Sequence, residues 1–304
     1  MNKKADAINI FYLGKGGVGK STSSAVTAIQ LAGKGFRVLL VSLDPAHNQS
    51  DIFEKRLSER PSQITRNLSA KEIDINHWIK KYLSSVENQI QKTYSYLTAF
   101  NLEKYFGVIK YSPGIEEYAL LTAYKGTRDK YTEMDYIIFD MPPTALTLKF
   151  FGLPVLSLTW LEKLADLRKE IIEKRKIITK IKLGKMEMER DKILNKINQQ
   201  TRSYQEIKAI FEDEKKTKIN LVMNPDKLSF SESLLIKNRL SEFNLRINKI
   251  VLNKYYTGFS LDQIEKNFEY KTIQLFHKSD NPLIGVQNLE NYLTAETKFE
   301  NAKK

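Results

Sequence analysis

Nine consecutive residues near the start of the chain have the types and spacing of a phosphate-binding loop. They are Gly14, Lys15, Gly16, Gly17, Val18, Gly19, Lys20, Ser21 and Thr22. The order matches a glycine, four residues of any type, and then Gly-Lys-Ser. Glycines let the backbone curl until several N–H groups face one anion. The Lys20 ammonium would bind the β- and γ-phosphates of a nucleotide, and the Ser21 hydroxyl would ligate Mg²⁺.

Two aspartates follow apolar segments and could complete this chemistry. Asp44 follows the segment 36–43 (FRVLLVSL), and Asp140 ends the segment 135–140 (DYIIFD). Because parallel strands present their carboxyl ends to the ligand, we predict that Asp44 orients or activates the attacking water and that Asp140 holds the Mg²⁺ ion. The alternative for Asp44 is a turn residue before Pro45. The pattern before Asp140 is weak by itself and gains its meaning from the loop.

Apolar strands alternate with helical segments on both sides of these residues. Alternation of this kind predicts an α/β fold with a doubly wound, mostly parallel sheet of the P-loop NTPase type. The segment 50–66 reads as polar surface, and a capping box of Ser229 and Glu232 is expected in one helix. Strands are expected at 8–13, 36–43, 135–140, 218–223 and 245–253, and helices at 23–32, 75–100, after 114, at 229–243 and at 282–295.

The segment 160–218 has a different character from the rest of the chain. It contains no proline and one glycine, Gly184, and its charge is dense and mostly basic. Its periodicity predicts two amphipathic helices joined near 183–188, inserted into an ATPase core made of 1–159 and 219–304. The apolar stripes either pack on each other or offer a surface to a partner. The stripe residues are Leu164, Leu167, Ile171, Ile178 and Ile181, then Ile193, Ile197, Tyr204, Ile207 and Phe211.

Composition excludes several classes of function. The chain has no cysteine, which rules out disulfides, thiolate zinc sites, iron–sulfur clusters and thiol nucleophiles. Residues 1–6 are polar, so no signal peptide is expected. The longest apolar run, 150–160, is too short for a membrane span and contains Pro154. We therefore expect a cytoplasmic protein, at most peripheral to a membrane. The net charge of +13 fits an anionic partner or, more plainly, a lysine-rich solvated surface.

Lys15, directly after the first glycine, makes the loop more specific. The string KGGVGKS resembles the deviant Walker A loop of dimeric ATPases. These include arsenite-pump, tail-anchored-protein targeting, partition and division-site ATPases, and nitrogenase iron protein. Further segments resemble the arsenite-pump ATPase family, to which the tail-anchored-protein targeting ATPases belong. The segments 38–51 and 140–148 are similar to its two switches, and the others are 67–74, 112–117, 224–232, 250–253 and 282–289.

The resemblance implies an ATPase whose homodimer closes over two ATP molecules and their Mg²⁺ ions. It implies that Lys15 acts in trans on the nucleotide of the partner subunit. It further implies that Ser21 and Asp140 serve the metal, that Asp44 acts on the water, and that Asn253 lies against the adenine. Residues 160–218 would then bind a protein client or a membrane partner under the control of the nucleotide.

The sequence departs from this family in ways that narrow the expectation. Members of the eukaryotic type hold zinc with a cysteine pair at the dimer interface, whereas this chain has no cysteine. It is therefore closer to bacterial or archaeal members, with no zinc and no thiolates for arsenite. Ala145 and Leu146 stand where the family usually has Gly-His. The insertion offers only Met186 and Met188 for a methionine-rich client groove.

An alternative function is that of an ATP-dependent surface-binding ATPase of the partition or division-site kind. Such a protein would bind DNA or an anionic membrane through its positive charge. Two features disfavour it, namely the long insertion at 160–218 and the polar segment 297–304, since a membrane-binding tail would need an apolar face. Nucleic acid is accordingly not an expected partner.

Overall fold

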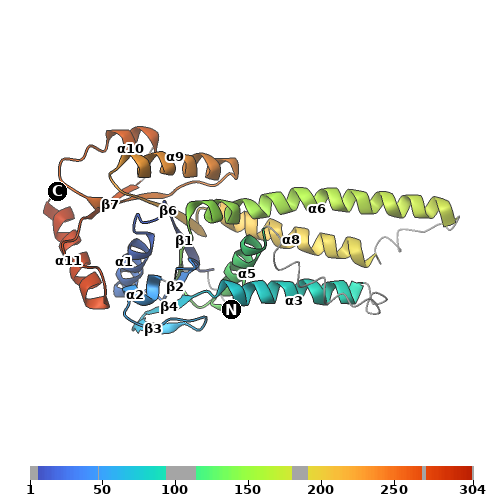
Figure 1. The fold of residues 1–304 in the computed structure, drawn as a ribbon, viewed down its shortest axis with the longest axis horizontal. Coiled ribbons are helices and arrows are strands. Elements are labelled where there is room, and N and C mark those ends of the chain that lie inside the picture. The colour runs from blue at the N-terminus through green and yellow to red at the C-terminus, as the bar shows by residue number, and fades with distance from the viewer. Residues whose placement is uncertain (1–5, 47, 94–113, 180–190, 269–271, 303–304) are drawn as a thin grey trace.

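A computed structural model describes residues 6–46, 48–93, 114–179, 191–268 and 272–302. Its centre is an eight-stranded sheet with the order β3-β4-β2-β5-β1-β6-β7-β8 (Figure 1). All strand pairs are parallel except β3 with β4, which confirms the predicted fold class. The strands are β1 (Ile8–Leu13), β2 (Val38–Ser42), β3 (Ser62–Thr65), β4 (Leu68–Glu72), β5 (Tyr136–Asp140), β6 (Thr217–Met223), β7 (Lys249–Tyr255) and β8 (Thr272–His277).

Helices cover both faces of the sheet. Buried residues of α1 and α11 belong to the core on one face, and those of α3, α5, α6, α8 and α9 belong to the core on the other. The helices are α1 (Lys20–Gly33), α2 (Asn48–Ile52), α3 (Ile75–Thr93), α5 (Ile115–Lys130), α6 (Thr144–Thr179), α8 (Lys192–Glu212), α9 (Lys227–Glu242), α10 (Asp262–Asn267) and α11 (Val286–Ala302).

An aromatic cluster lies in the core on the face of the sheet that α5, α6 and α8 cover. Phe11, on the central strand β1, is fully buried. Its ring centroid lies 5.0 to 6.2 Å from five other aromatic rings, which come from α5, β5, α6 and α8. Burial of six rings against one another fixes the bases of α6 and α8 on the sheet. The other five rings belong to Tyr124, Phe139, Phe150, Phe151 and Phe211.

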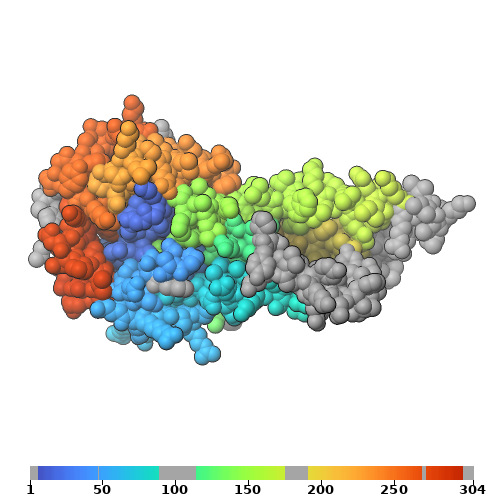
Figure 2. All heavy atoms as spheres, viewed as in Figure 1, coloured from blue at the N-terminus to red at the C-terminus, as the bar shows by residue number. Residues whose placement is uncertain are grey.

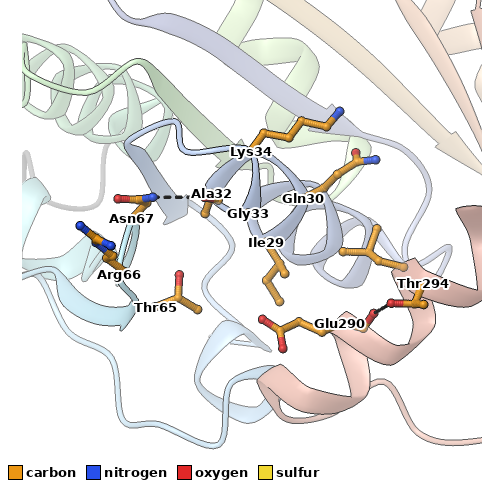
Figure 3. Close-up of a pocket in the computed structure, with 11 residues that line it drawn as sticks. Ile29, Gln30, Ala32, Gly33, Lys34, Thr65, Arg66, Asn67, Glu290 and Thr294 are labelled. Carbon is orange, nitrogen blue, oxygen red and sulfur yellow. Dashed lines mark hydrogen bonds between the residues drawn. The ribbon is translucent and has the colours of Figure 1, made fainter.

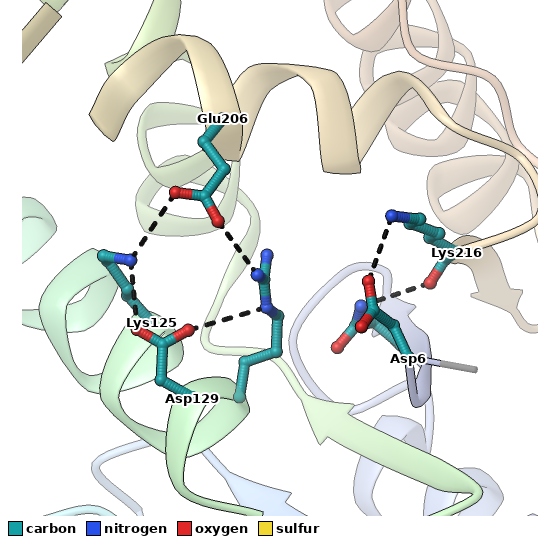
Figure 4. A network of polar contacts seen from close by, with 7 residues as sticks. Asp6, Lys125, Asp129, Glu206 and Lys216 are labelled. Atoms are coloured by element: carbon teal, nitrogen blue, oxygen red, sulfur yellow. Dashed lines mark hydrogen bonds and ion pairs between the residues drawn. The ribbon is translucent and has the colours of Figure 1, made fainter. Parts of the chain in front are cut away.

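Beyond this cluster α6 and α8 form an arm that extends away from the sheet, with α3 running in the same direction beside it (Figures 1 and 2). Arg168 of α6 and Asp191 pair at 2.7 Å, and Asp191 also caps α8 by accepting a hydrogen bond from the Leu194 backbone N–H at 2.8 Å. Nearer the sheet, Glu206 of α8 pairs with Lys125 and Arg128 of α5 (Figure 4). Ion pairs and helix packing thus hold the arm to α5.

The helix that contains the start of the expected insertion is longer than predicted, and its apolar residues lie on two sides. The helix α6 begins at Thr144, so the predicted boundary at residue 160 falls inside a helix, and only residues 140–143 of the expected second switch lie outside it. On α6, Leu161 and Ile172 are buried, whereas the predicted stripe residues Leu167 and Ile171 are 53% and 46% exposed. Apolar residues lie on two sides of α6, and their spacing does not tell which side packs.

The remaining stripe residues are described only in part. On α8 the expected residues Ile207 and Phe211 are buried. The side chain of Ile178, residue Ile181 and the joint at 183–188 lie outside the part of the chain that is described.

One helix corrects the expectation that no stretch could cross a membrane. The stretch Thr144–Lys174 of α6 is long and apolar enough by length and composition. The expectation counted an uninterrupted apolar run, whereas this stretch includes Lys149, Pro154 and the charged residues that follow Leu161. A core helix of a soluble protein passes the same test, and 44% of the most apolar 18-residue window of this stretch is buried inside the protein. Composition alone therefore assigns α6 no membrane role.

Three strands, β3, β4 and β8, were not predicted from the sequence, and β3 and β4 consist mainly of polar residues. β4, with the sequence LSAKE, is buried although it contains Lys71 and Glu72. The Lys71 ammonium pairs with Glu59 at 3.2 Å, and the Glu72 carboxylate accepts hydrogen bonds from the backbone and the hydroxyl of Ser50. β3 falls in the segment read as polar surface, and β8 forms the opposite edge of the sheet. Of the helix expected at 75–100, residues 94–100 lie outside the described part.

Phe11→Ala tests the aromatic cluster. It removes a fully buried ring and should lower the free energy of unfolding by about 3–5 kcal/mol, measured by chemical denaturation. Phe36→Ala is the matched control, because Phe36 is 39% exposed and its loss should cost under about 1 kcal/mol. Equal effects of the two substitutions would contradict the role given to the cluster.

Candidate nucleotide site

The glycine-rich loop leaves the central strand β1 at its carboxyl end and leads directly into α1. Two of its glycines are fixed by close neighbours. Gly14 has φ +149°, and a Cβ there would lie 2.3 Å from the carbonyl oxygen of Val222; Gly19 has φ +93°, and its Cβ would meet the amide nitrogen of Asn253. Only glycine avoids both the strain and the contact at these positions. The backbone is therefore shaped as the phosphate-binding pattern predicts.

Lys20 is buried within this loop and has negative charges around it. Its side chain is 6% exposed, and its ammonium donates to the carbonyl oxygen of Lys15 at 3.3 Å. Burial lowers the pKa of Lys20, while the charges of Asp140, Asp44 and Glu232 act in the opposite direction. The structure thus gathers Lys20 and both predicted aspartates at the carboxyl ends of neighbouring central strands. An anionic ligand there would meet a cation with limited access to water.

Asp140 ends β5 and is fully buried. One carboxylate oxygen, Oδ2, accepts a hydrogen bond from Gln49 Nε2 at 2.9 Å, and the other, Oδ1, has no hydrogen-bond partner among the described residues. Burial raises the pKa of Asp140 to about 6, against the lowering effects of Gln49, the Ser21 hydroxyl and Lys20. A buried carboxylate oxygen without a donor favours a cation, or water bound to one, in this position.

These residues fit a Mg²⁺ ion. Mg²⁺ is held in phosphate sites by one or two protein oxygens together with phosphate oxygens and water. Asp140 Oδ1 and the Ser21 hydroxyl supply oxygens of that kind. No cluster of three or more His, Asp or Glu side chains that could hold a metal occurs in the described part of the chain.

Asp44 lies just after β2 and is partly exposed. Its Oδ1 accepts a hydrogen bond from the backbone N–H of Ala46 at 3.0 Å, which is the turn contact that the alternative interpretation described. The same carboxylate lies close enough to Lys20 and Asp140 to influence the pKa of both. The turn therefore holds Asp44 at the site.

The remaining predicted residues lie around the loop. Asn253, near the end of β7, donates through Nδ2 to the carbonyl oxygen of Val18 at 2.8 Å. The pairing of β7 with β8 shifts between Asn253 and Tyr255, and Lys254 has φ +55°. Gly16 and Gly17 are exposed, and Lys15, Ser21 and Thr22 are partly exposed. Asn253 is thus beside the nucleotide loop, where a contact with the base stays a prediction.

The structure adds two contacts that sequence reasoning missed. Gln49, in the short helix α2, is fully buried and hydrogen-bonds to Asp140; a single polar residue after the Asp44 turn carries no signal of this. Glu232 was expected to complete a capping box with Ser229, but Asp226 caps α9 by accepting from the Ser229 backbone N–H at 2.8 Å. Glu232 instead accepts from the Thr144 hydroxyl at 2.6 Å.

A surface pocket of about 490 Å³ lies away from the nucleotide loop, at the other end of α1 (Figure 3). The last turns of α1, the turn between β3 and β4, and α11 line it. Asn67 Nδ2 donates to the Ala32 carbonyl oxygen across one side of the pocket at 3.3 Å. The pocket contains none of the residues predicted to bind nucleotide.

Comparison with known proteins gives a consistent result. The family model described as anion-transporting ATPase matches residues 8–291. An arsenical pump-driving ATPase 2 from Aquifex aeolicus is 32% identical, over 80% of this chain and 79% of that protein. An arsenical pump-driving ATPase from Prosthecochloris vibrioformis is 29% identical, over 92% and 72%. An ATPase ASNA1 homolog from Plasmodium falciparum is 33% identical, over 86% and 65%.

The shape of the loop is tested by Gly14→Ala. The new methyl group would meet the Val222 carbonyl in a backbone region that alanine avoids, so nucleotide affinity should fall at least about tenfold, a loss of about 1.4 kcal/mol. Binding of a fluorescent ATP analogue measures it. Gly33→Ala is the control, because a methyl group at Gly33 in α1 would have no neighbour within 4 Å, and it should leave affinity unchanged and gain helix stability.

The buried carboxylate predicts a pH dependence in protein freed of metal and nucleotide. An Asp140 pKa of about 6, above the ordinary 3.8, favours unfolding as pH rises between these values, by about 3 kcal/mol in total. Asp140→Asn removes this term, so the variant should gain stability relative to wild type between about pH 4 and pH 6. Chemical denaturation in EDTA at several pH values measures the difference, and parallel curves would contradict the prediction.

Proposed function

The chain belongs to the anion-transporting ATPase family and is an ATP hydrolase, and from this premise we propose that it works as a Mg²⁺-dependent, nucleotide-gated homodimer that binds and releases a partner through its helical arm. The observation that carries the proposal is the gathering of Lys20, Asp44 and Asp140 around one phosphate-binding loop. The arm begins immediately beyond the same site, with Thr144 as its first residue.

Each of these residues has a separate role in the proposed hydrolysis of ATP. The loop N–H groups and Lys20 bind the phosphates and neutralise the charge that develops on them. Ser21 and Asp140 would hold a Mg²⁺ ion, which would supply positive charge that stabilises the phosphate groups during hydrolysis. Asp44 orients the attacking water and accepts its proton. Because Lys20 and Asp140 are buried, their electrostatic effects are stronger than they would be in water.

Lys15 supports the proposed dimer. Its carbonyl oxygen accepts a hydrogen bond from Lys20, while the residue itself is partly exposed. No ion pair of its ammonium group is found among the described residues. A cation placed in this way can reach the phosphates of a second subunit and act on the transition state as an arginine finger does.

Thr144 links the nucleotide loop to the arm. Its hydroxyl donates to Glu232 and lies 3.5 Å from the carbonyl oxygen of Gly14. Glu232 in turn lies close enough to Lys20 to influence its pKa. Thr144 is the first residue of α6. A change in the bound phosphates that alters the contacts of Thr144 would therefore change the position of the first turn of this helix.

The partner surface is proposed on the exposed side of α6. Leu156 and Trp160 are each 65% exposed, and Leu167 and Ile171 continue the same side of the helix at spacings of seven and four residues. Exposed apolar side chains in a row favour an apolar partner segment. The Aquifex relative is named for driving an arsenical pump; without cysteine this chain offers no thiolates to arsenite, so we propose a protein partner, met in the cytoplasm or at the membrane periphery.

Mixing of variants tests the role of Lys15. Lys15→Ala and Asp44→Asn should each lower kcat about 10²- to 10⁴-fold. If Lys15 acts in trans, mixed dimers of the two variants contain one site with an intact Asp44 and an intact Lys15 from the other subunit. ATPase activity should therefore return on mixing. A mixture as inactive as its components would show that Lys15 acts within its own subunit or that no dimer forms.

A second experiment tests the arm. Leu167→Ser with Ile171→Ser should abolish nucleotide-dependent binding of a fluorescent synthetic apolar helical peptide while ATP hydrolysis continues. The control is Leu228→Ser with Leu235→Ser, two comparably exposed leucines on α9, which should keep peptide binding. Equal binding by all three proteins would contradict the assignment of the surface.

A further inference from the structure

Gln49 occupies an unusual position for an uncharged polar residue. It lies in α2, five residues after Asp44, and its side chain is fully buried. Its amide nitrogen lies 2.9 Å from Asp140 Oδ2, 3.0 Å from the Ser21 carbonyl oxygen and 3.1 Å from Ser24 Oγ. It therefore joins the segment after Asp44 to both elements that carry the proposed metal oxygens.

The hydrogens of this amide can be accounted for. A glutamine NH₂ group donates two hydrogen bonds. The Ser24 hydroxyl donates to the Ser21 carbonyl oxygen at 2.8 Å, so its lone pairs remain open to the amide. One amide hydrogen thus serves Asp140, and the second is shared between Ser21 and Ser24. Of the two Asp140 carboxylate oxygens, Oδ2 is therefore the one that accepts the hydrogen bond from Gln49.

The oxygens that remain are equally informative. Asp140 Oδ1 and Gln49 Oε1 are both buried, and neither has a hydrogen-bond partner among the described residues. Both atoms are acceptors, so no hydrogen bond can form between them. A donor or a cation at the nucleotide site would satisfy them, which is what a metal ion with its bound water provides.

We propose that Gln49 is a positioning residue for the metal, which holds Asp140 through Oδ2 and leaves Oδ1 to the Mg²⁺ shell. The inference rests on the proposed Mg²⁺-dependent function and adds to it. Residues that hydrogen-bond to a metal-binding carboxylate orient it, and their loss commonly costs 10- to 100-fold in metal affinity. Because Gln49 follows Asp44 closely, it also ties the residue proposed to act on the water to the residue that serves the metal.

Binding of Mn²⁺ in the presence of ADP, followed by electron paramagnetic resonance, tests the inference. Gln49→Met keeps the length of the side chain but cannot donate, and it should weaken Mn²⁺ binding about 10- to 100-fold. The affinity for a fluorescent ADP analogue in EDTA should stay within about twofold. Ser24→Ala is the control, since it removes another partner of the same amide without touching Asp140, and it should bind Mn²⁺ as wild type does.

A double-variant cycle separates positioning from packing. If Gln49 acts through Asp140, then Gln49→Met should weaken Mn²⁺ binding little further in an Asp140→Asn background. Gln49→Asn, which withdraws the amide by one methylene, gives the same expectation should Gln49→Met prove unstable. Unchanged Mn²⁺ affinity, an equal loss in Ser24→Ala, or additive losses in the cycle would overturn the inference. Failure of wild type to bind Mn²⁺ with ADP would instead overturn the proposed function, and this inference with it.

Discussion

The site depends on the burial of two opposite charges, Lys20 and Asp140, at the carboxyl ends of the central strands. Lys20 and Asp140 are 6% and 0% exposed, and removing such groups from water is costly unless each has a partner. Parallel pairing of the strands brings the two charges close to each other. Tyr12 of β1 and Ser42 of β2 are both in register with Asp140 of β5. The loop after β1, the turn after β2 and the end of β5 therefore meet at a single point.

The aromatic core provides the rigidity that this arrangement requires. Phe11 lies on the strand that feeds the nucleotide loop, and Phe139 directly precedes Asp140. Their rings stack at 5.0 Å, with Phe150 and Phe211 packed against Phe11. The packing that supports the site thus also holds the bases of both arm helices. The arm helices and the strand that leads into the nucleotide loop therefore pack in the same aromatic cluster.

The sequence predicts those parts of the structure that depend on residues close together in the chain. It does not predict the parts that depend on contacts between distant residues. β1 and the loop were predicted because apolar continuity and glycine spacing are local properties, and the fold class followed from alternation. β4 was missed because Lys71 and Glu72 are buried only by virtue of Glu59 and Ser50, which are distant in sequence. Gln49 and Glu232 are further cases of this kind, since their partners come from other elements. The exposed side of α6 could not be chosen because apolar residues occur on both sides.

The continuity of α6 has a mechanical consequence. A helix of 36 residues rises about 1.5 Å per residue and so spans roughly 54 Å. It is anchored near one end, where Thr144 meets the loop, while its far half extends past the sheet. A tilt of about 5° at that anchor would displace the tip by about 5 Å. In a rigid helix of this length, a small tilt at the anchored end would therefore become a displacement the size of a side chain at the tip.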